Sequence, residues 1–188
     1  MTRQEIIDLQ QRIGATPDGF WGPRSIAACQ AHLKALEPKV NPWTASTQAA
    51  LQAFYGDAGD EDQLVALNVA AYGVRYDGQP VKSIRCHDKV ADSLDRILAK
   101  LSEIPQGRFA LKQYAGCYNN RLMRGGSLPS LHARGAAIDL DPATNRNRQA
   151  WPTSATMPIE VMEIFAAEGW TCAGAAWGRD AMHMQATS

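Results

Sequence analysis

The chain has 188 residues, and its 19 Lys and Arg balance 19 Asp and Glu, giving a formal net charge of zero at pH 7. This length predicts one domain or two small ones, and a hydrophobic share of 45% excludes a wholly disordered chain. Binding to nucleic-acid phosphates or to an anionic membrane needs accumulated Lys and Arg, so we expect no nucleic-acid partner. No apolar stretch approaches the ~18 residues that span a bilayer, so we expect no membrane insertion either.

The first residues, Met-Thr-Arg-Gln-Glu-Ile-Ile-Asp, contain polar side chains where a signal peptide would need an apolar core. We therefore predict no signal peptide and a protein held in the cytoplasm where it is made. The four cysteines lie far apart without a C-x-x-C pair, so neither a zinc ribbon nor a dithiol redox site is indicated. We expect reduced, mostly buried thiols at Cys29, Cys86, Cys117 and Cys172.

Apolar residues at helical spacing predict three short helices in about the first 55 residues. The first helix carries Ile6 and Leu9 on its apolar side and stops before Gly14. The second opens at Pro23, where the missing N–H is tolerated, and ends before Pro38. The third follows Asn41-Pro42-Trp43-Thr44, and its inward candidates are Thr47, Ala50, Leu51 and Phe54.

These helices carry a recognisable pattern: Leu9-Gln10, then Asp18-Gly19-Phe20-Trp21-Gly22, then Ser25 and Ala28 at helical spacing. The pattern resembles the small peptidoglycan-binding domain of bacterial and phage cell-wall hydrolases. It departs from that family at Ser25, where Thr is usual, and at Cys29-Gln30, where Phe-Gln is usual. The resemblance implies a three-helix fold that binds the cell wall, although the Asp-Gly turn and Trp21 could serve only to build the helical core.

Residues 56–62, Gly-Asp-Ala-Gly-Asp-Glu-Asp, concentrate acids and glycines in a way that suits a solvated linker. We therefore predict a first domain over residues 1–57, a linker over 58–63 and a second domain over 64–188. The second domain is expected to contain, in chain order, a short helix over 64–71, an amphipathic helix through Val90, Leu94, Ile97, Leu98 and Leu101, a strand around 109–113, a strand over 136–140, a helix over 158–168 and a last strand around Met182 and Met184. This order predicts an α+β fold with a small antiparallel sheet.

Two dense motifs follow in the second domain. Residues 130–141 contain His132 and Asp139, and residues 177–184 contain Asp180 and His183. A catalytic zinc takes three protein ligands from His and carboxylate side chains and leaves a position for water, so His132, Asp139 and His183 could hold one zinc ion. Asp180 is then the natural proton acceptor. Taken alone, each motif is more typical of a hydrogen-bonded structural pair.

Together, the two motifs resemble the D-Ala-D-Ala carboxypeptidase family of zinc peptidases, which includes many phage endolysins. The resemblance continues through residues 115–125 and through Gly169-Trp170 and Trp177, so it covers about residues 80 to 188. It implies that His132, Asp139 and His183 are the zinc ligands and that Asp180 is the catalytic base. It also implies an arginine that stabilises the developing oxyanion; Arg121 matches best, with Arg124 as the alternative, and one of the two could bind a substrate carboxylate.

Several neighbouring residues are assigned less directly. We expect Ser130 to hydrogen-bond within the site or to substrate, Gly135 to allow a tight backbone path, and Trp177 to contact substrate. Trp151 and Trp170 could line the cleft or simply pack. We expect His87 to have a structural or surface role and His32 to be solvated, while Asp141, close to Asp139 on the same strand face, is left for a role beside the metal ligands or in a turn.

The two resemblances together imply a monomeric peptidoglycan hydrolase, specifically a phage or prophage endolysin. It would stay in the host cytoplasm until lysis and then act on the wall in the periplasm. The first domain would hold the enzyme on murein, and the second would cleave the stem peptide as an L-alanyl-D-glutamate endopeptidase. The alternatives are D,D-carboxypeptidase or endopeptidase activity on D-Ala bonds, and a non-catalytic wall-binding protein.

Overall fold

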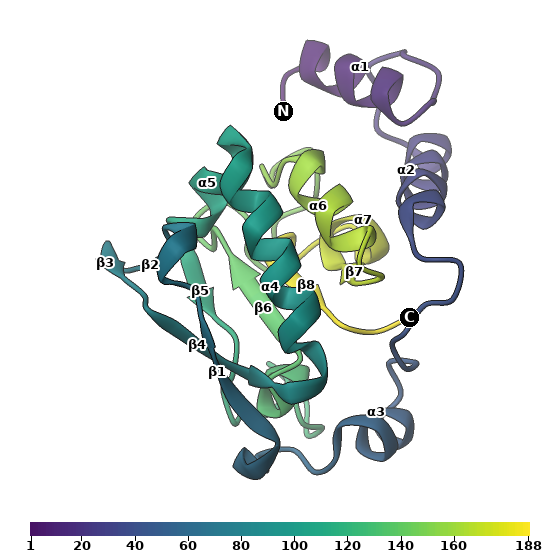
Figure 1. Ribbon diagram of the computed structural model, residues 1–188. Helices are drawn as coiled ribbons and strands as arrows, with labels where there is room; N and C mark the ends of the chain where they lie inside the picture. Colours follow the sequence, from purple (N-terminus) through teal and green to yellow (C-terminus); the bar gives the residue numbers. More distant parts are fainter.

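The computed structural model describes residues 1–188 and contains seven α-helices, three short 3₁₀ helices and eight strands (Figure 1). In chain order these are α1 (Arg3–Arg12), α2 (Pro23–Leu36), α3 (Gln48–Tyr55), η1 (Glu61–Gln63), β1 (Leu64–Asn68), η2 (Ala70–Tyr72), β2 (Arg75–Tyr76), β3 (Gln79–Pro80), β4 (Ser83–His87), α4 (Asp88–Glu103), α5 (Pro105–Leu111), β5 (Tyr114–Gly116), η3 (Leu131–Arg134), β6 (Ala137–Leu140), α6 (Ile159–Ala166), β7 (Thr171–Cys172), α7 (Ala173–Trp177) and β8 (His183–Gln185). None of the helices has the length and apolar composition needed to cross a membrane. The predicted α+β class is confirmed.

The largest sheet is antiparallel, with its four strands in the order β5-β6-β8-β7. Its register places Asp139 of β6 directly opposite His183 of β8, and Ile138 opposite Met184. Because side chains alternate between the faces of a strand, Asp139 and His183 share one face while Ile138 and Met184 share the other. The sheet therefore separates a polar face from an apolar one.

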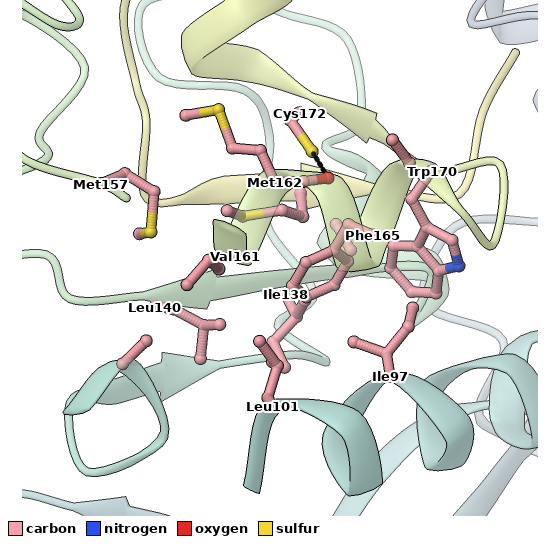
Figure 2. Packing of buried hydrophobic residues seen from close by; sticks show 14 of the residues in the cluster. Ile97, Leu101, Ile138, Leu140, Met157, Val161, Met162, Phe165, Trp170 and Cys172 are labelled. Atoms are coloured by element: carbon pink, nitrogen blue, oxygen red, sulfur yellow. Dashed lines mark hydrogen bonds between the residues drawn. The ribbon is translucent and has the colours of Figure 1, made fainter. Parts of the chain in front are cut away.

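The apolar face of this sheet is covered by α4 and α6. Figure 2 shows Ile138 and Leu140 of β6 meeting Ile97 and Leu101 of α4 and Phe165 of α6, and all five side chains are fully buried. The predicted helix through Val90 to Leu101 is confirmed, because its apolar residues recur every three or four positions and point into this core. This packing holds β6 and β8 in place from behind the site.

Two predicted elements are wrong. Residues 64–71 begin as strand β1 and not as a helix, because β1 pairs antiparallel with β4, a strand that the sequence pattern did not indicate. Residues 109–113 are not a strand, since α5 runs to Leu111 and leaves Phe109 exposed. Gly107 allows α5 to pack closely on the end of α4: a Cβ atom at this position would lie 2.2 Å from the carbonyl oxygen of Leu101.

The three N-terminal helices form as predicted, and they lie one after another along one side of the molecule, with α3 well separated from α1 and α2 (Figure 1). Helix α2 packs against α6 and α7. At the far end, the Tyr55 hydroxyl of α3 donates to the carbonyl of Ala186 at 2.7 Å, and its ring meets His87 edge-on. Of the third helix's inward candidates, Leu51 is buried, whereas Thr47 is an exposed N-cap.

Gln10, the glutamine of the Leu-Gln pair, is fully buried and ties the Asp-Gly turn to α2. Its amide nitrogen donates to Asp18 Oδ1 at 2.8 Å and to Ser25 Oγ at 2.9 Å, while its carbonyl accepts from the N–H of Gly19. Trp21 packs edge-on against Trp151, with ring centroids 5.5 Å apart. These residues therefore have a structural role, and their affinity for the wall stays a prediction.

The chain is held at the start of the predicted linker by two hydrogen bonds to η3. The N–H of Gly59 donates to the carbonyl of Ala133 at 2.7 Å, and Arg134 Nε donates to the carbonyl of Gly56 at 3.0 Å. One hydrophobic cluster contains buried residues from α1, α2 and α3 together with the core of residues 64–188. The division of the chain at residues 58–63 stays a prediction.

Three histidine and cysteine predictions have outcomes in this fold. All four cysteines are free and buried, as expected. His87 has a structural role, since its Nε2–H donates to the carbonyl of Tyr55 at 3.0 Å. The expectation that His32 is solvated is wrong: its Nε2 lies 2.8 Å from Glu163 of α6, because α2 packs against that helix.

Candidate active site

His132 lies in η3, a short helix that begins and ends at residues suited to those positions. Ser130 is the N-cap, and its hydroxyl accepts a hydrogen bond from the backbone N–H of His132 at 3.4 Å. Gly135 ends the helix with φ +66°, the left-handed conformation that glycine adopts without strain. The chain then enters β6, and this tight path brings the side chains of His132 and Asp139 next to each other.

His183 begins β8, directly after a turn at Asp180. The backbone N–H of His183 donates to the carbonyl of Asp180 at 2.9 Å, and Asp180 has φ +58°. A positive φ at a residue other than glycine is uncommon and is found more often at functional sites. The turn brings the Asp180 carboxyl back toward the polar face of the sheet, beside His183.

Three side-chain atoms converge above this face. His132 Nε2 lies 3.2 Å from Asp139 Oδ1 and 3.1 Å from His183 Nδ1, and Asp139 Oδ1 lies 3.0 Å from His183 Nδ1. The structure therefore brings together the three predicted ligands, which come from η3, β6 and β8. We call these residues the triad.

The outer nitrogens of the two imidazoles indicate where their protons lie. His132 Nδ1 is 2.6 Å from the carbonyl oxygen of Cys117, which can only accept, so Nδ1 carries the proton. His183 Nε2 is 3.1 Å from Gln185 Oε1, and the amide nitrogen of Gln185 donates to Thr187 Oγ1 at 2.8 Å. The inner nitrogens, His132 Nε2 and His183 Nδ1, then carry lone pairs that face the Asp139 carboxylate. Three electron-pair donors meet without a proton between them, which is the arrangement a cation stabilises.

The spacing of the triad also fits a tetrahedral zinc site. Ligand atoms about 2.0–2.1 Å from zinc in a tetrahedron lie roughly 3.3 Å from one another. The three separations in the triad, 3.0 to 3.2 Å, are close to that value. Two imidazoles and one carboxylate are a donor set found in catalytic zinc sites, which leave the fourth position open to water.

The charges of the site favour a cation as well. Burial alone raises the pKa of Asp139, but its close contacts with His132 and His183 outweigh burial and hold that pKa well below its ordinary value. Burial lowers the pKa of His183, yet contacts with Asp139 and Gln185 and the charge of Asp180 raise it overall. Asp139 is therefore anionic, and the electrostatic potential at His183 is negative.

Asp180 has a carboxyl oxygen, Oδ1, that is buried without a hydrogen-bond partner. Burial raises the pKa of this carboxyl, and repulsion from Asp139 raises it further, while nearby His183 and Arg124 lower it. A raised pKa makes a carboxylate a stronger base. The structure places this group at the triad, on the side where His183 lies.

A cavity of about 230 Å³ opens over Asp139 and His183. Its lining includes the remaining predicted site residues, Arg121, Arg124, Ser130, Trp177 and Asp180. Trp177 is half exposed and stacks on His183, with ring centroids 5.9 Å apart and planes inclined by 26°. All eight predicted site residues therefore lie at the triad or in the cavity beside it.

A second cavity, of about 330 Å³, adjoins the first at Asp139 and continues past His132. Arg121 and Arg124 line both cavities, whereas Tyr76, Tyr114 and Tyr118 line only this one. The triad consequently lies where two cavities meet, with His183 lining the first and His132 lining the second.

Sequence reasoning missed Gln185, Arg179 and Asn147 in the first cavity. Gln185 could have been predicted, because it lies two positions after His183 and a strand places such residues on one face. Arg179 and Asn147 come from loops, which have no such periodicity. Trp151 and Trp170 are buried and pack in the core, and Asp141 closes a turn in which its carboxylate accepts from Thr144 and Asn145.

No curated protein and no solved structure matches the chain significantly. Residues 124–186, which include the whole triad and Asp180, match the family model described as D-alanyl-D-alanine carboxypeptidase.

Proposed function

We propose that this chain is a zinc peptidase that cleaves the peptide part of peptidoglycan. The observation that carries the proposal is the triad, in which two oriented imidazole lone pairs and one carboxylate converge within 3.2 Å beside a buried, unpartnered Asp180 oxygen. The family match over residues 124–186 supports it, because that description names a D-alanyl-D-alanine carboxypeptidase. One zinc ion held by His132, Asp139 and His183 is part of the proposal.

The residues around the triad have distinct roles in this hydrolysis. A bound zinc ion would lower the pKa of its water and polarise the scissile carbonyl. Asp180 would accept the proton released as the water oxygen adds to the carbonyl carbon, and would return it to the amine when the C–N bond breaks. Arg121 would donate to the carbonyl oxygen as negative charge develops there. Arg124 would bind a substrate carboxylate, Ser130 would hydrogen-bond within the site, and Trp177 would contact the substrate.

The shape of the site favours an endopeptidase. A carboxypeptidase needs room for one terminal residue beyond the scissile bond, whereas an endopeptidase needs space on both sides of it. Cavities of about 230 and 330 Å³ meet at Asp139, so chain could extend in both directions. The resemblance to endolysins of the zinc peptidase family selects the bond, and we propose cleavage between L-Ala and D-Glu of the stem peptide. The family description favours a second candidate, which is hydrolysis of a D-Ala bond.

We further propose that residues 1–57 bind the wall and that the protein acts as a monomeric endolysin, kept in the host cytoplasm until lysis. The support is the Leu-Gln and Asp-Gly pattern of the first helices, together with an exposed Phe20 in that turn. Anchoring would raise the local concentration of the peptidase near its substrate. A wall-binding protein without catalysis is disfavoured, because every metal and base position holds a competent side chain.

Mass spectrometry of murein digested by the zinc-loaded protein tests the bond assignment. The expected products carry a new N-terminal D-Glu, and fragments that instead show only released D-Ala would contradict the assignment. Asp180→Asn should lower the rate by roughly 10²-fold or more, since it removes the base while keeping the shape. Asp92→Asn, at an exposed position on α4, is the matched control and should keep full activity.

A further inference from the structure

The second cavity has a lining unlike that of the first. Tyr76, Tyr114 and Tyr118 bring aromatic rings to it, and Asn119 adds a solvent-exposed amide. The first cavity instead holds Arg179 and Asp180 and only one aromatic side chain, Trp177. The two cavities therefore suit different chemical groups.

The tyrosines of the second cavity are held in defined positions. Tyr76 lies in the β2–β3 hairpin, which Figure 1 shows at one edge of the molecule beside β5. Its ring meets that of Tyr114 edge-on, with centroids 6.3 Å apart, yet the residue is 55% exposed. The Tyr118 hydroxyl donates to Glu61 at 3.1 Å, and Arg85 lies over its ring. An exposed aromatic ring backed by fixed ones offers a flat apolar surface with polar atoms around it.

The position of Asp180 sets the direction in which a substrate would lie. Asp180 lines the first cavity and not the second. A base that returns its proton to the leaving amine must lie on the leaving-group side of the scissile bond. The amine product would therefore occupy the first cavity and the acyl product the second.

This direction matches the chemistry of the two ends of the substrate. If L-Ala–D-Glu is the bond cleaved, the amine product begins with D-Glu and carries the carboxylates of the stem peptide. Arg179 lines only the first cavity and could pair with such groups, while Arg124 lines both cavities. The acyl product ends in L-Ala, whose nitrogen is joined through a lactyl group to the muramic acid sugar. That sugar would then reach the tyrosine-lined cavity.

We infer that the second cavity is a saccharide subsite, in which Tyr76 packs against the muramic acid ring of the substrate. This inference rests on the proposed function, because only cleavage next to L-Ala brings the sugar close to the triad. The enzyme would accordingly distinguish glycan-linked stem peptides from free ones. Tyr76 would act as a specificity-determining residue without taking part in the chemical step.

The test compares two substrates of the full-length zinc-loaded protein: a stem peptide whose L-Ala carries N-acetylmuramic acid and the same peptide carrying N-acetyl. The kcat/KM of the muramoyl substrate should be the higher one. Tyr76→Ala should lower it roughly three- to tenfold, mainly through KM, and should leave the acetyl peptide unchanged. Phe109→Ala removes an aromatic side chain that is 56% exposed and lies outside both cavities, so it should change neither value.

The possible failures are distinguishable. Cleavage of both substrates between L-Ala and D-Glu with equal kcat/KM would overturn the saccharide subsite and leave the bond assignment intact. An equal effect of Tyr76→Ala on the two substrates would also overturn it. Absence of cleavage at this bond in both substrates would overturn the proposed endopeptidase function and the subsite with it.

Discussion

Gln185 fixes the orientation of a triad ligand without touching the centre of the triad. Its carbonyl oxygen lies 3.1 Å from His183 Nε2, and its amide nitrogen donates to Thr187 Oγ1 at 2.8 Å. The Thr187 hydroxyl in turn contacts Thr171 on β7. The proton on His183 Nε2 is therefore held by a chain of side chains that crosses from β8 to the neighbouring strand, and Nδ1 stays free for a metal.

Gln185→Leu should weaken zinc binding about 10- to 100-fold, because a leucine of similar size cannot accept the His183 proton. Competition with a chelator of known affinity measures the change. Gln106→Leu, at an exposed position on α5, is the control and should bind zinc as the wild type does. Equal zinc affinity in the Gln185 variant would mean that the hydrogen bond does not position His183.

Ser130 and Gly135 show how a short element can position a metal ligand. Ser130 begins η3 and Gly135 ends it, so the helix has one turn in which to present His132. Gly135 also lies against β4: a Cβ atom there would be 2.8 Å from the backbone nitrogen of His87 and 3.1 Å from the carbonyl carbon of Cys86. The element that carries His132 is thus fitted to the backbone of a strand far away in sequence.

Gly135→Ala should lower the free energy of unfolding by about 2–4 kcal/mol, because it adds a backbone clash to the cost of a positive φ. Gly178→Ala is a matched control, since Gly178 has a similar φ of +69° and no atom within 4 Å of the added methyl. That variant should lose only about 1 kcal/mol. Urea denaturation measures both, and equal losses would show that contact with β4 contributes nothing.

Helices α1, α2 and α6 meet in one charge cluster. Arg12 of α1 donates to Glu163 of α6 at 2.6 Å, and His32 of α2 lies 2.8 Å from the same carboxylate. Burial raises the pKa of Glu163, but the hydrogen bonds from Arg12 and His32 lower it by more, so the net shift of the pKa is downward. A carboxyl group whose pKa is lowered by folding stabilises the folded state above its ordinary pKa.

Glu163→Gln should therefore destabilise the protein by about 1 kcal/mol at pH 7. The ordinary pKa of a glutamate is 4.5, and folding lowers that of Glu163. The difference in unfolding free energy between variant and wild type should therefore shrink below pH 4.5 and vanish once the pH has fallen through the lowered pKa of the folded state. Urea denaturation over this pH range measures it, with the exposed Glu103→Gln of α4 as the control. A difference that stays constant with pH would contradict the ionic origin of the contact.

At the scale of the whole molecule, the candidate metal ligands and the long amphipathic helix were predictable from the sequence. The triad residues stand in two motifs with few other histidines, and α4 shows five apolar residues at helical spacing. Strand β1 was not predictable in this way, because its pairing with β4 depends on contacts between residues about 20 positions apart. The short alternation at 109–113 was misleading, since packing on α4 decides that α5 is a helix.

The arrangement of the N-terminal helices also depends on contacts that the sequence does not display. Tyr55 is fully buried against His87 and Ala186, although neither residue is near it in the chain. Likewise, the resemblance of α1 and α2 to a wall-binding domain gave no sign that α2 would pack on α6 and α7. Helical periodicity predicts which face is apolar, but it does not identify the partner that covers that face.

The central claim is that one zinc ion held by His132, Asp139 and His183 supports peptide hydrolysis. Titrating zinc into chelator-treated full-length protein, while following binding by calorimetry and hydrolysis of murein, tests it most directly. The account predicts one ion per chain, recovery of activity in step with binding, and loss of both in Asp139→Ala. Full activity of the metal-free protein, or unchanged zinc binding by Asp139→Ala, would contradict it.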